Sequence, residues 1–182
     1  MVRALALAFL IFPASVAAQD GCPAAPDHSD EVLSIIDELR QAPSEAAAIP
    51  LMDRLWRLWT DAPDARAQGM LDRGMAQREG YDFLGSRDTL DGLVEYCPDY
   101  AEGYNQRAFA SFLRQEYPAA LVDLDRALEL SPHHIGALSG KALTLMGLGR
   151  QDDAFDTLRA AVSLNPWLRE RAMLPDPPGV DL

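Results

Sequence analysis

Apolar residues near the beginning of the chain recur every three or four positions, as on one face of an amphipathic helix. They form two stripes, which are Val32, Ile35, Ile36 and Leu39, followed by Leu51, Leu55, Leu58 and Trp59. Pro43 separates the stripes, and Ser29 and Ser44 are suitable N-cap residues. We therefore predict two helices, over 30–41 and 44–60.

The rest of the chain repeats the same pattern of large and small residues every 34 positions. Pro98, Pro132 and Pro166 are spaced by 34, and the segments 101–134 and 135–168 align without a gap. The matched positions are Tyr104 with Leu138, Ala108 with Ala142, Ala120 with Ala154, Leu124 with Leu158, and Ala127 with Ala161. No segment shows the two-residue alternation of a β-strand, so the pattern predicts helices throughout.

These segments resemble the tetratricopeptide repeat, a pair of antiparallel helices that recurs every 34 residues. Small residues at fixed positions of that family let two helix backbones approach closely, and large residues fill the space between them. The segment 135–168 has a nearly complete set, and the segment 101–134 departs at Ser111. The segment 67–100 departs at Gln77 and Leu93, so we interpret it as a divergent repeat.

The resemblance implies an all-α fold: a helical-hairpin solenoid, or tetratricopeptide superhelix, of about three repeats, with an N-terminal helical pair and a short C-terminal cap. The predicted segments are a signal peptide (1–18), a flexible segment (19–29), capping helices (30–66), three repeats within 67–168 (67–100, 101–134 and 135–168), and a cap and tail (169–182). We expect the helical pair and Trp167–Leu174 to cover the two ends of the stack. Asp99 and Glu102 have the spacing of a capping box that opens the second repeat.

The first eighteen residues follow the pattern of a bacterial signal peptide. Arg3 precedes the apolar run ALALAFLIF, and Val16 and Ala18 are small residues just before a predicted cleavage at Gln19. An uncleaved anchor is the alternative, but this run is shorter than the roughly 20 residues that span a bilayer. We expect a periplasmic protein, secreted through the inner membrane, whose mature chain does not insert into a membrane.

Export affects the interpretation of the two cysteines. Cys22 and Cys97 are 75 positions apart, and an oxidising compartment favours a disulfide between them. The alternative is two thiols that never meet. Their spacing matches neither a CxxC redox motif nor a zinc site.

The resemblance also implies that the first helix of each repeat lines a concave groove. Residues spaced by three and four share one helical face, and the predicted partner-binding residues are Gln68, Leu71, Met75, Arg78, Glu102, Asn105, Phe109, Phe112, Ser139, Leu143 and Met146. This mixture of apolar and polar side chains suits an extended peptide or a partner helix. The alternative is that Phe109, Phe112 and Leu143 only pack against neighbouring repeats.

Charge and composition argue against several classes of function. The net charge of −12 disfavours nucleic acid. Arg73, Arg107 and Lys141 recur 34 residues apart, and we interpret them as local ion-pair partners of Asp91, Asp123 or Asp125. A ladder of cations for an acidic ligand is the alternative.

No catalytic or metal-binding motif stands out in the sequence. We interpret His28, His133 and His134, which are all the histidines of the chain, as solvated residues of loops and turns. The prediction is therefore a protein without a catalytic residue, a cofactor or a metal.

The predicted function is that of a non-catalytic periplasmic adaptor or scaffold that binds another envelope protein, or a peptide segment of one, in its groove. One alternative is a structural envelope protein that associates with itself. A less favoured one is an uncharacterised enzyme.

Overall fold

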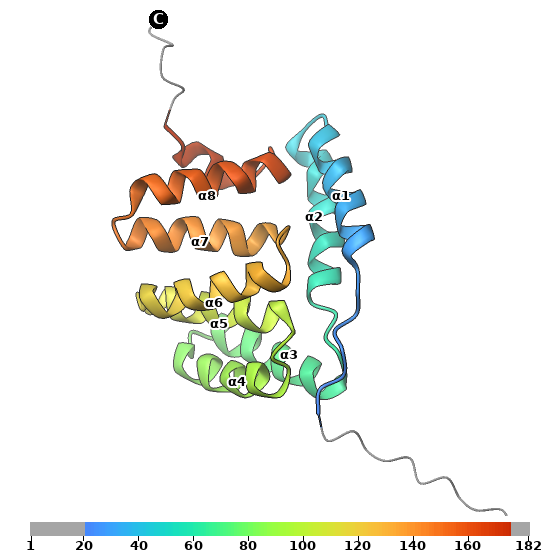
Figure 1. Ribbon diagram of the computed structural model, residues 1–182, viewed down its shortest axis with the longest axis vertical. Coiled ribbons are helices and arrows are strands. Elements are labelled where there is room, and N and C mark those ends of the chain that lie inside the picture. Colours follow the sequence, from blue (N-terminus) through green and yellow to red (C-terminus); the bar gives the residue numbers. More distant parts are fainter. Residues whose placement is uncertain (1–20, 176–182) are drawn as a thin grey trace, which may run out of the picture.

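The computed structural model describes residues 21–175, which form eight α-helices and one 3₁₀ helix (Figure 1). The helices are α1 (Ser29–Gln41), α2 (Glu45–Trp59), α3 (Ala65–Glu79), α4 (Phe83–Tyr96), α5 (Ala101–Leu113), α6 (Tyr117–Leu130), α7 (Ile135–Gly147), α8 (Gln151–Leu164) and η1 (Arg169–Met173). The predicted signal peptide and the last seven residues of the predicted tail lie outside the described residues. Within 21–175, no helix combines the length and the apolar character that a membrane crossing requires.

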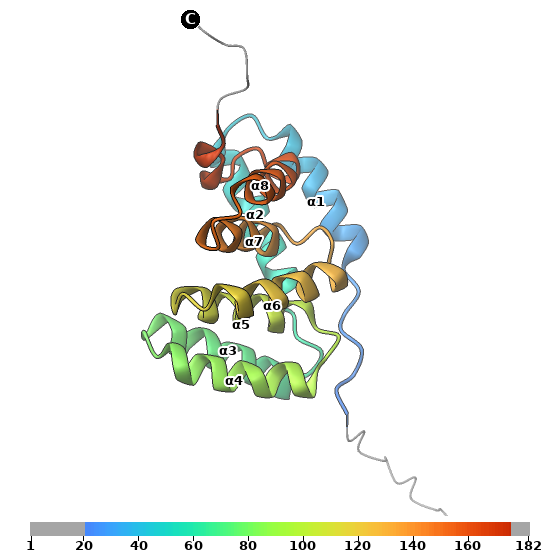
Figure 2. The ribbon, with the colours of Figure 1, turned by 60° about the vertical axis from the view of Figure 1, so that its left-hand side comes forward.

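Six of the helices form three consecutive antiparallel hairpins, α3/α4, α5/α6 and α7/α8, which stack side by side (Figures 1 and 2). The all-α hairpin architecture confirms the predicted fold class. The first two helices also begin and end within one residue of the predicted positions.

Small residues allow the close approach of the two helices in each hairpin. Ala108, Ala120, Ala142 and Ala154 are all buried. At Gly74, an added Cβ would lie 2.7 Å from Cγ of Leu90, closer than two carbon atoms can pack. The regular return of these residues therefore reflects the helix spacing that the fold requires.

The divergent first repeat compensates locally for its departures from the pattern. Gln77, at a position that is usually apolar, is hydrogen-bonded to the Thr89 hydroxyl across the α3/α4 hairpin, at 2.7 Å. Leu93 replaces a small residue and is buried. It packs beside Gly103 of α5, where an added Cβ would lie 3.4 Å from Leu93 Cδ2.

The α1/α2 hairpin does not stack on the α3/α4 hairpin, as a cap of the first repeat would. It runs across the ends of the repeat helices, from the level of α3 to that of α8 (Figure 1). Its apolar face forms one core with residues of α7, of α8 and of the segment between α8 and η1, namely Ile135, Leu138, Leu164, Trp167 and Leu168. Our expectation that it covers the open side of the first repeat was wrong, because its apolar stripe has these partners instead.

A hydrogen bond and a disulfide fasten the two ends of this hairpin region. Where α1 turns into α2, Trp167 Nε1 donates a hydrogen bond to the carbonyl of Ala42, at 3.1 Å. At the other end, a disulfide joins Cys22 to Cys97, the C-cap residue of α4, with 5.1 Å between their Cα atoms. The segment that leads into α1 is thus attached to the first repeat.

The segment around η1 packs against the third repeat, as predicted for the residues up to Leu174. Leu168 and Leu174 lie against the core that α7 and α8 form around Ala142 and Leu158. This contact covers apolar surface at the C-terminal end of the stack.

Two of the predicted helix caps are wrong. Ser44 does cap α2, since its hydroxyl accepts from the Ala47 amide. Ser29, however, lies inside α1, which begins after His28 without a side-chain cap. The capping box at the start of α5 does not form either, because Asp99 pairs with Arg126 and Glu102 points into a buried polar network.

Candidate partner-binding groove

A groove of about 310 Å³ lies between α5 and α7, with α2 and the segment around η1 on its sides. Six of the predicted partner-binding residues meet there, which are Arg78, Asn105, Phe109, Phe112, Ser139 and Leu143. They come from the first helices of all three repeats, as the resemblance implied. The repeat stack therefore brings these six side chains, which are distant in sequence, to one surface.

The other five predicted residues are placed elsewhere. Leu71 is buried in the α3/α4 core, and Met75 packs against that core. Met146 packs against the α7/α8 core. Gln68 is hydrogen-bonded to the Ala62 amide and to Asp72, and Glu102 lies below the groove in the polar network described below.

The wall that α2 contributes was not predicted from the sequence. Met52 and Trp56 of α2, together with Leu168 and Glu170, also line the groove. They were missed because α2 was expected at the end of the stack. One signal was present: Trp56 lies outside the apolar stripe of its helix, on the face expected to be polar.

The groove combines exposed aromatic rings with unused hydrogen-bonding groups. Phe109 is 45% exposed and Trp56 is 42% exposed, although both are large apolar side chains. In the groove lining, the buried hydroxyls of Ser139 and Thr144 have no hydrogen-bond partner within residues 21–175. Buried polar atoms are usually paired, so a ligand that supplies a donor or an acceptor would be stabilised here.

Arg78 contributes a positive charge to the groove. Its guanidinium lies 4.6 Å from the centre of the Phe109 ring, in the geometry of a cation–π contact, and donates a hydrogen bond to Gln106 Oε1. Burial lowers the pKa of Arg78, an effect that the nearby carboxylates of Glu79 and Glu102 partly oppose.

Beneath Arg78 lies a buried polar network centred on Glu102. Its carboxylate accepts hydrogen bonds from Gln106 (2.5 Å) and Asn105 (3.0 Å), and His134 Nε2 lies 2.7 Å away. The other ring nitrogen of His134, Nδ1, accepts from the Ala137 amide and so caps α7. The imidazole proton therefore lies on Nε2 and is donated to Glu102.

His134 corrects a prediction, because it is not solvated. It is 1% exposed and stacks on Trp59 at the end of α2, with 4.1 Å between ring centres. Sequence alone could not place Trp59 above this turn. The stack links the N-terminal hairpin to the network that reaches Arg78.

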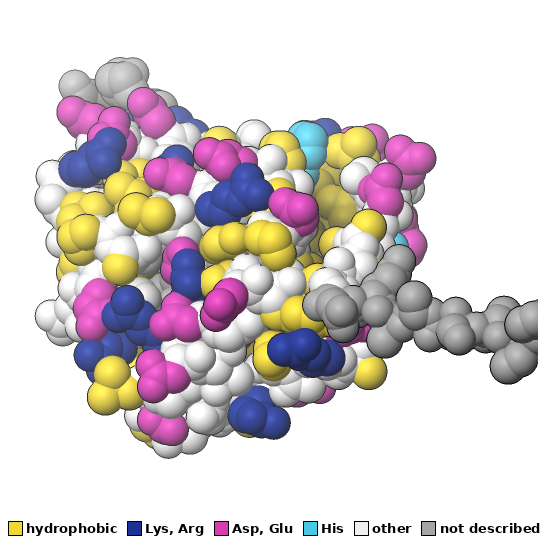
Figure 3. All heavy atoms as spheres, turned by 60° about the horizontal axis from the view of Figure 1, so that its bottom comes forward, with side chains coloured by type: hydrophobic (Ala, Val, Ile, Leu, Met, Phe, Trp, Pro, Cys, Tyr) yellow, Lys and Arg dark blue, Asp and Glu magenta, His cyan; other side chains and the backbone are white. Residues whose placement is uncertain are grey.

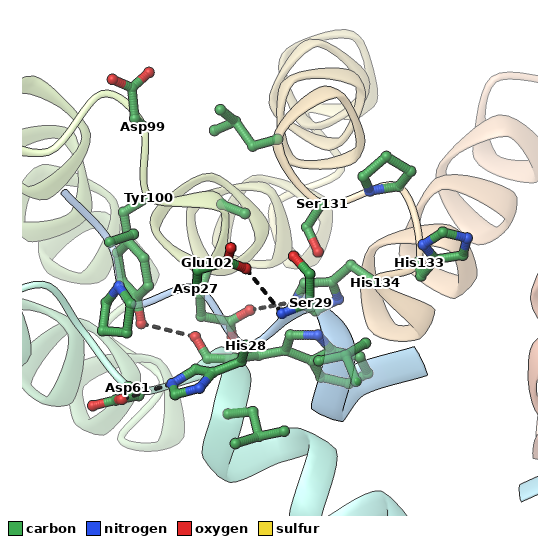
Figure 4. Close-up of a pocket in the computed structure, with 18 of the residues that line it drawn as sticks. Asp27, His28, Ser29, Asp61, Asp99, Tyr100, Glu102, Ser131, His133 and His134 are labelled. Atoms are coloured by element: carbon green, nitrogen blue, oxygen red, sulfur yellow. Dashed lines mark hydrogen bonds and ion pairs between the residues drawn. The ribbon is translucent and has the colours of Figure 1, made fainter. Parts of the chain in front are cut away.

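A second cavity, of about 490 Å³, lies between residues 25–29, the end of α2 and the turns that precede α5 and α7 (Figure 4). Most of its polar groups pair with one another: His28 with Asp61 (2.8 Å), Glu102 with His134, and the Tyr100 hydroxyl with the Trp59 carbonyl (2.9 Å). Burial raises the pKa of Tyr100. The Tyr100–Trp59 bond fastens the hairpin to the repeats, whereas the other two pairs join residues within the hairpin region and within the repeats. We therefore assign this cavity a structural role.

The repeated cations confirm the local-pairing interpretation at two of three positions. Arg107 pairs with Asp91 (2.8 Å) and Asp123 (2.5 Å), and Lys141 pairs with Asp125 (2.6 Å). Arg73 makes no ion pair with another described residue. Figure 3, which looks toward the α3/α4 end of the stack, shows basic and acidic side chains interspersed and not separated.

No group of three or more His, Cys, Asp or Glu side chains within residues 21–175 is arranged to hold a metal ion.

The chain is similar in sequence to a TPR repeat-containing protein of Rhizobium etli. The two are 29% identical over 158 residues, which cover 80% of this chain and 75% of that protein. No protein-family model matches the chain. This relative is bacterial, and its name describes it as containing TPR repeats.

Solved structures share the fold. A tetratricopeptide domain of yeast Sti1 is 24% identical, with a TM-score of 0.54, covering 56% of this chain and 81% of that domain. The first tetratricopeptide domain of Spaghetti is 18% identical, with a TM-score of 0.58, covering 59% of this chain and 86% of that domain. At these identities the likeness establishes the fold alone.

Proposed function

We propose that this chain, a tetratricopeptide-repeat protein in its sequence pattern and in its fold, is a non-catalytic adaptor that holds a segment of a partner protein in the groove between α2, α5 and α7. The observation that carries this proposal is the combination, on one surface, of the exposed rings of Trp56 and Phe109 with the unpaired buried hydroxyl of Ser139. Aromatic anchors supply binding energy by burial, and unpaired polar atoms can bond to a peptide backbone.

Two proteins of the same fold support the idea of a peptide ligand. The Sti1 domain was solved as a complex with pHsp70, and the Spaghetti domain was solved bound to the Hsp90 peptide SRMEEVD. From these two proteins we infer only that this fold can hold a peptide segment. The side chains of this groove determine which peptide sequence binds.

We further propose that the protein acts in the periplasm. The predicted signal peptide and the Cys22–Cys97 disulfide support this location, because disulfides persist in oxidising compartments. Cell fractionation with mass spectrometry tests it. The expected product begins at Gln19, is found in the periplasmic fraction and has no titratable thiol; a cytoplasmic, full-length product with two free thiols would contradict the proposal.

Affinity purification from envelope extracts tests the groove with one variant and one matched control. Phe109→Ala removes an exposed ring inside the groove, whereas Val122→Ala removes an exposed apolar side chain on α6, where Val122 is 68% exposed. We chose Phe109 over Phe112, because Phe112 packs against Tyr117 and the α5/α6 core. Partners recovered with the wild type and with Val122→Ala should be lost with Phe109→Ala, and equal recovery by both variants would refute the groove assignment.

A further inference from the structure

Arg78 differs from the other partly buried arginines of the repeats in lacking a carboxylate partner. Arg87 pairs with Glu116 at 2.6 Å, and Arg107 pairs with Asp91 and Asp123. Within residues 21–175, Arg78 forms no ion pair, and its side-chain partners are Gln106 and the Phe109 ring. A cation that is partly removed from water without a counter-ion is costly, so an anionic ligand would be stabilised at this position.

The Glu102 network holds Arg78 in place without neutralising it directly. Gln106 accepts from Arg78 through Oε1 and donates to Glu102 through Nε2. The carboxylate of Glu102 is thus one amide away from the guanidinium. Because a guanidinium has five N–H donors and one of them is bonded to Gln106, the others remain able to bind a carboxylate with two parallel hydrogen bonds.

From this geometry we infer that the groove selects partner segments that carry an acidic side chain next to an apolar one. In this complex, Arg78 binds the carboxylate of the acidic side chain. The apolar side chain would lie between Phe109 and Leu143. The inference rests on the proposed peptide-binding function and states the class of peptide that the groove binds.

The carboxylate is assigned to a side chain of the ligand and not to a chain terminus. The guanidinium of Arg78 reaches from Gln106, which is 2% exposed, to the exposed ring of Phe109. A glutamate side chain can descend to this depth while the main chain of the ligand stays at the level of the rings of Trp56 and Phe109. A terminal carboxylate would have to draw the main chain itself into the groove.

A peptide array tests the inference with the complete, disulfide-bonded protein. The probes are acetylated, amidated seven-residue peptides with apolar residues at varied positions, each synthesised with an internal Glu and again with Gln. A second set of the Gln peptides has a free carboxyl end. Arg78→Gln is the test variant, and Arg66→Gln is the matched control, because Arg66 is on the same helix and also lies over an aromatic ring, that of Tyr96 at 3.9 Å.

The wild type and Arg66→Gln should prefer the Glu peptides over their Gln counterparts by about tenfold, as expected for a charge-assisted hydrogen bond. Arg78→Gln should bind both kinds equally, and Arg78→Lys, which keeps the charge, should retain part of the preference. Equal thermal unfolding of the variants would show that folding is unaffected. If Arg78→Gln unfolds, the inference is tested by the Glu-over-Gln preference of the wild type and of Arg78→Lys: it holds if the wild type has the preference and Arg78→Lys retains part of it.

The failures of the two proposals are distinguishable. The inference is overturned if Arg78→Gln still prefers the Glu peptides, or if the wild type binds Glu and Gln peptides equally. In either case the groove function stands if Phe109→Ala abolishes binding. Binding that requires a free carboxyl end overturns the assignment to a side chain. If the array binds nothing, or binds Phe109→Ala as well as the wild type, peptide binding in the groove fails and the inference fails with it.

Discussion

The two C-terminal repeats and the N-terminal hairpin are both built from pairs of amphipathic helices, yet different contacts position them. In the repeats, alanines that return at fixed offsets bring each helix against its neighbour in sequence. The α1/α2 hairpin has one buried alanine, Ala48, outside the 34-residue pattern, and its apolar stripe packs against side chains more than a hundred residues away, such as Leu164 and Trp167. Local spacing thus defines the repeats, whereas long-range contacts define the position of the hairpin.

This difference has a functional consequence. A stack of repeats alone would leave the groove open on the side of α2. The hairpin adds Met52 and Trp56 to that side, and the stack of Trp59 on His134 connects it to the network below Arg78. The part of the molecule that does not follow the repeat pattern therefore shapes the site.

The largest expected effects come from truncating one core leucine in each region. Leu55 of α2 and Leu158 of α8 are both fully buried, so Leu55→Ala and Leu158→Ala should each lower the free energy of unfolding by about 2–5 kcal/mol. Hydrogen exchange distinguishes them: Leu55→Ala should speed exchange in α1 and α2 first, and Leu158→Ala in α7 and α8. If Leu55→Ala accelerates exchange equally in all eight helices, the hairpin is not a separable unit.

A change at the junction of the two regions should have the next largest effect. His134→Ala removes the cap of α7 and a hydrogen bond to the buried Glu102 carboxylate, for an expected loss of about 3 kcal/mol. His133→Ala is the matched control, because His133 is next to His134 in sequence but is exposed. Its side chain should contribute at most about 0.5 kcal/mol to the free energy of unfolding. Chemical denaturation of both variants provides the comparison, and similar values would mean that His134 does not join the regions.

Overfilling the repeat seam should have a moderate effect. Ala142→Leu places a large side chain where Leu158 and Ala161 leave no space, which should cost about 1–3 kcal/mol. Ala160→Leu adds the same atoms to an exposed position of α8 and should leave stability nearly unchanged. Thermal melting of the two variants should therefore differ, and matching curves would be inconsistent with the proposed role of small residues.

The smallest effect concerns the pH dependence of stability at Asp64, the N-cap residue of α3, in the linker that follows α2. The Asp64 carboxylate caps α3 through the Ala67 amide and accepts from the Tyr96 hydroxyl, and these two bonds, in that order, lower its pKa. A lowered folded-state pKa stabilises the protein above the unfolded-state value near 4, and this contribution is lost as the pH falls further. The free energy of unfolding should therefore decrease less below about pH 4 in Asp64→Asn than in the wild type. Tyr96→Phe should show the same change to a smaller extent. Acid titrations of stability that are identical for wild type and Asp64→Asn would exclude this contribution.

The sequence predicted the hairpin repeats and six of the residues that line the groove, because these depend on offsets within one repeat. It could not predict the walls formed by Trp56 and Met52, whose positions depend on where α2 packs. The same limit applies to His134 and Glu102. We predicted a solvated turn residue at His134 and a residue of the groove and of a capping box at Glu102. The two form a buried pair instead, and Trp59, which is far away in sequence, stacks on His134.

Photo-crosslinking in intact cells tests the central claim most directly. A photoreactive phenylalanine analogue is placed at Trp56, at Phe109 or, as the outward-facing control, at Val122. If a partner segment lies between α2 and α5, positions 56 and 109 should capture the same protein and position 122 should not. Capture from position 122 alone, or different proteins from positions 56 and 109, would contradict a single binding groove with α2 as its wall.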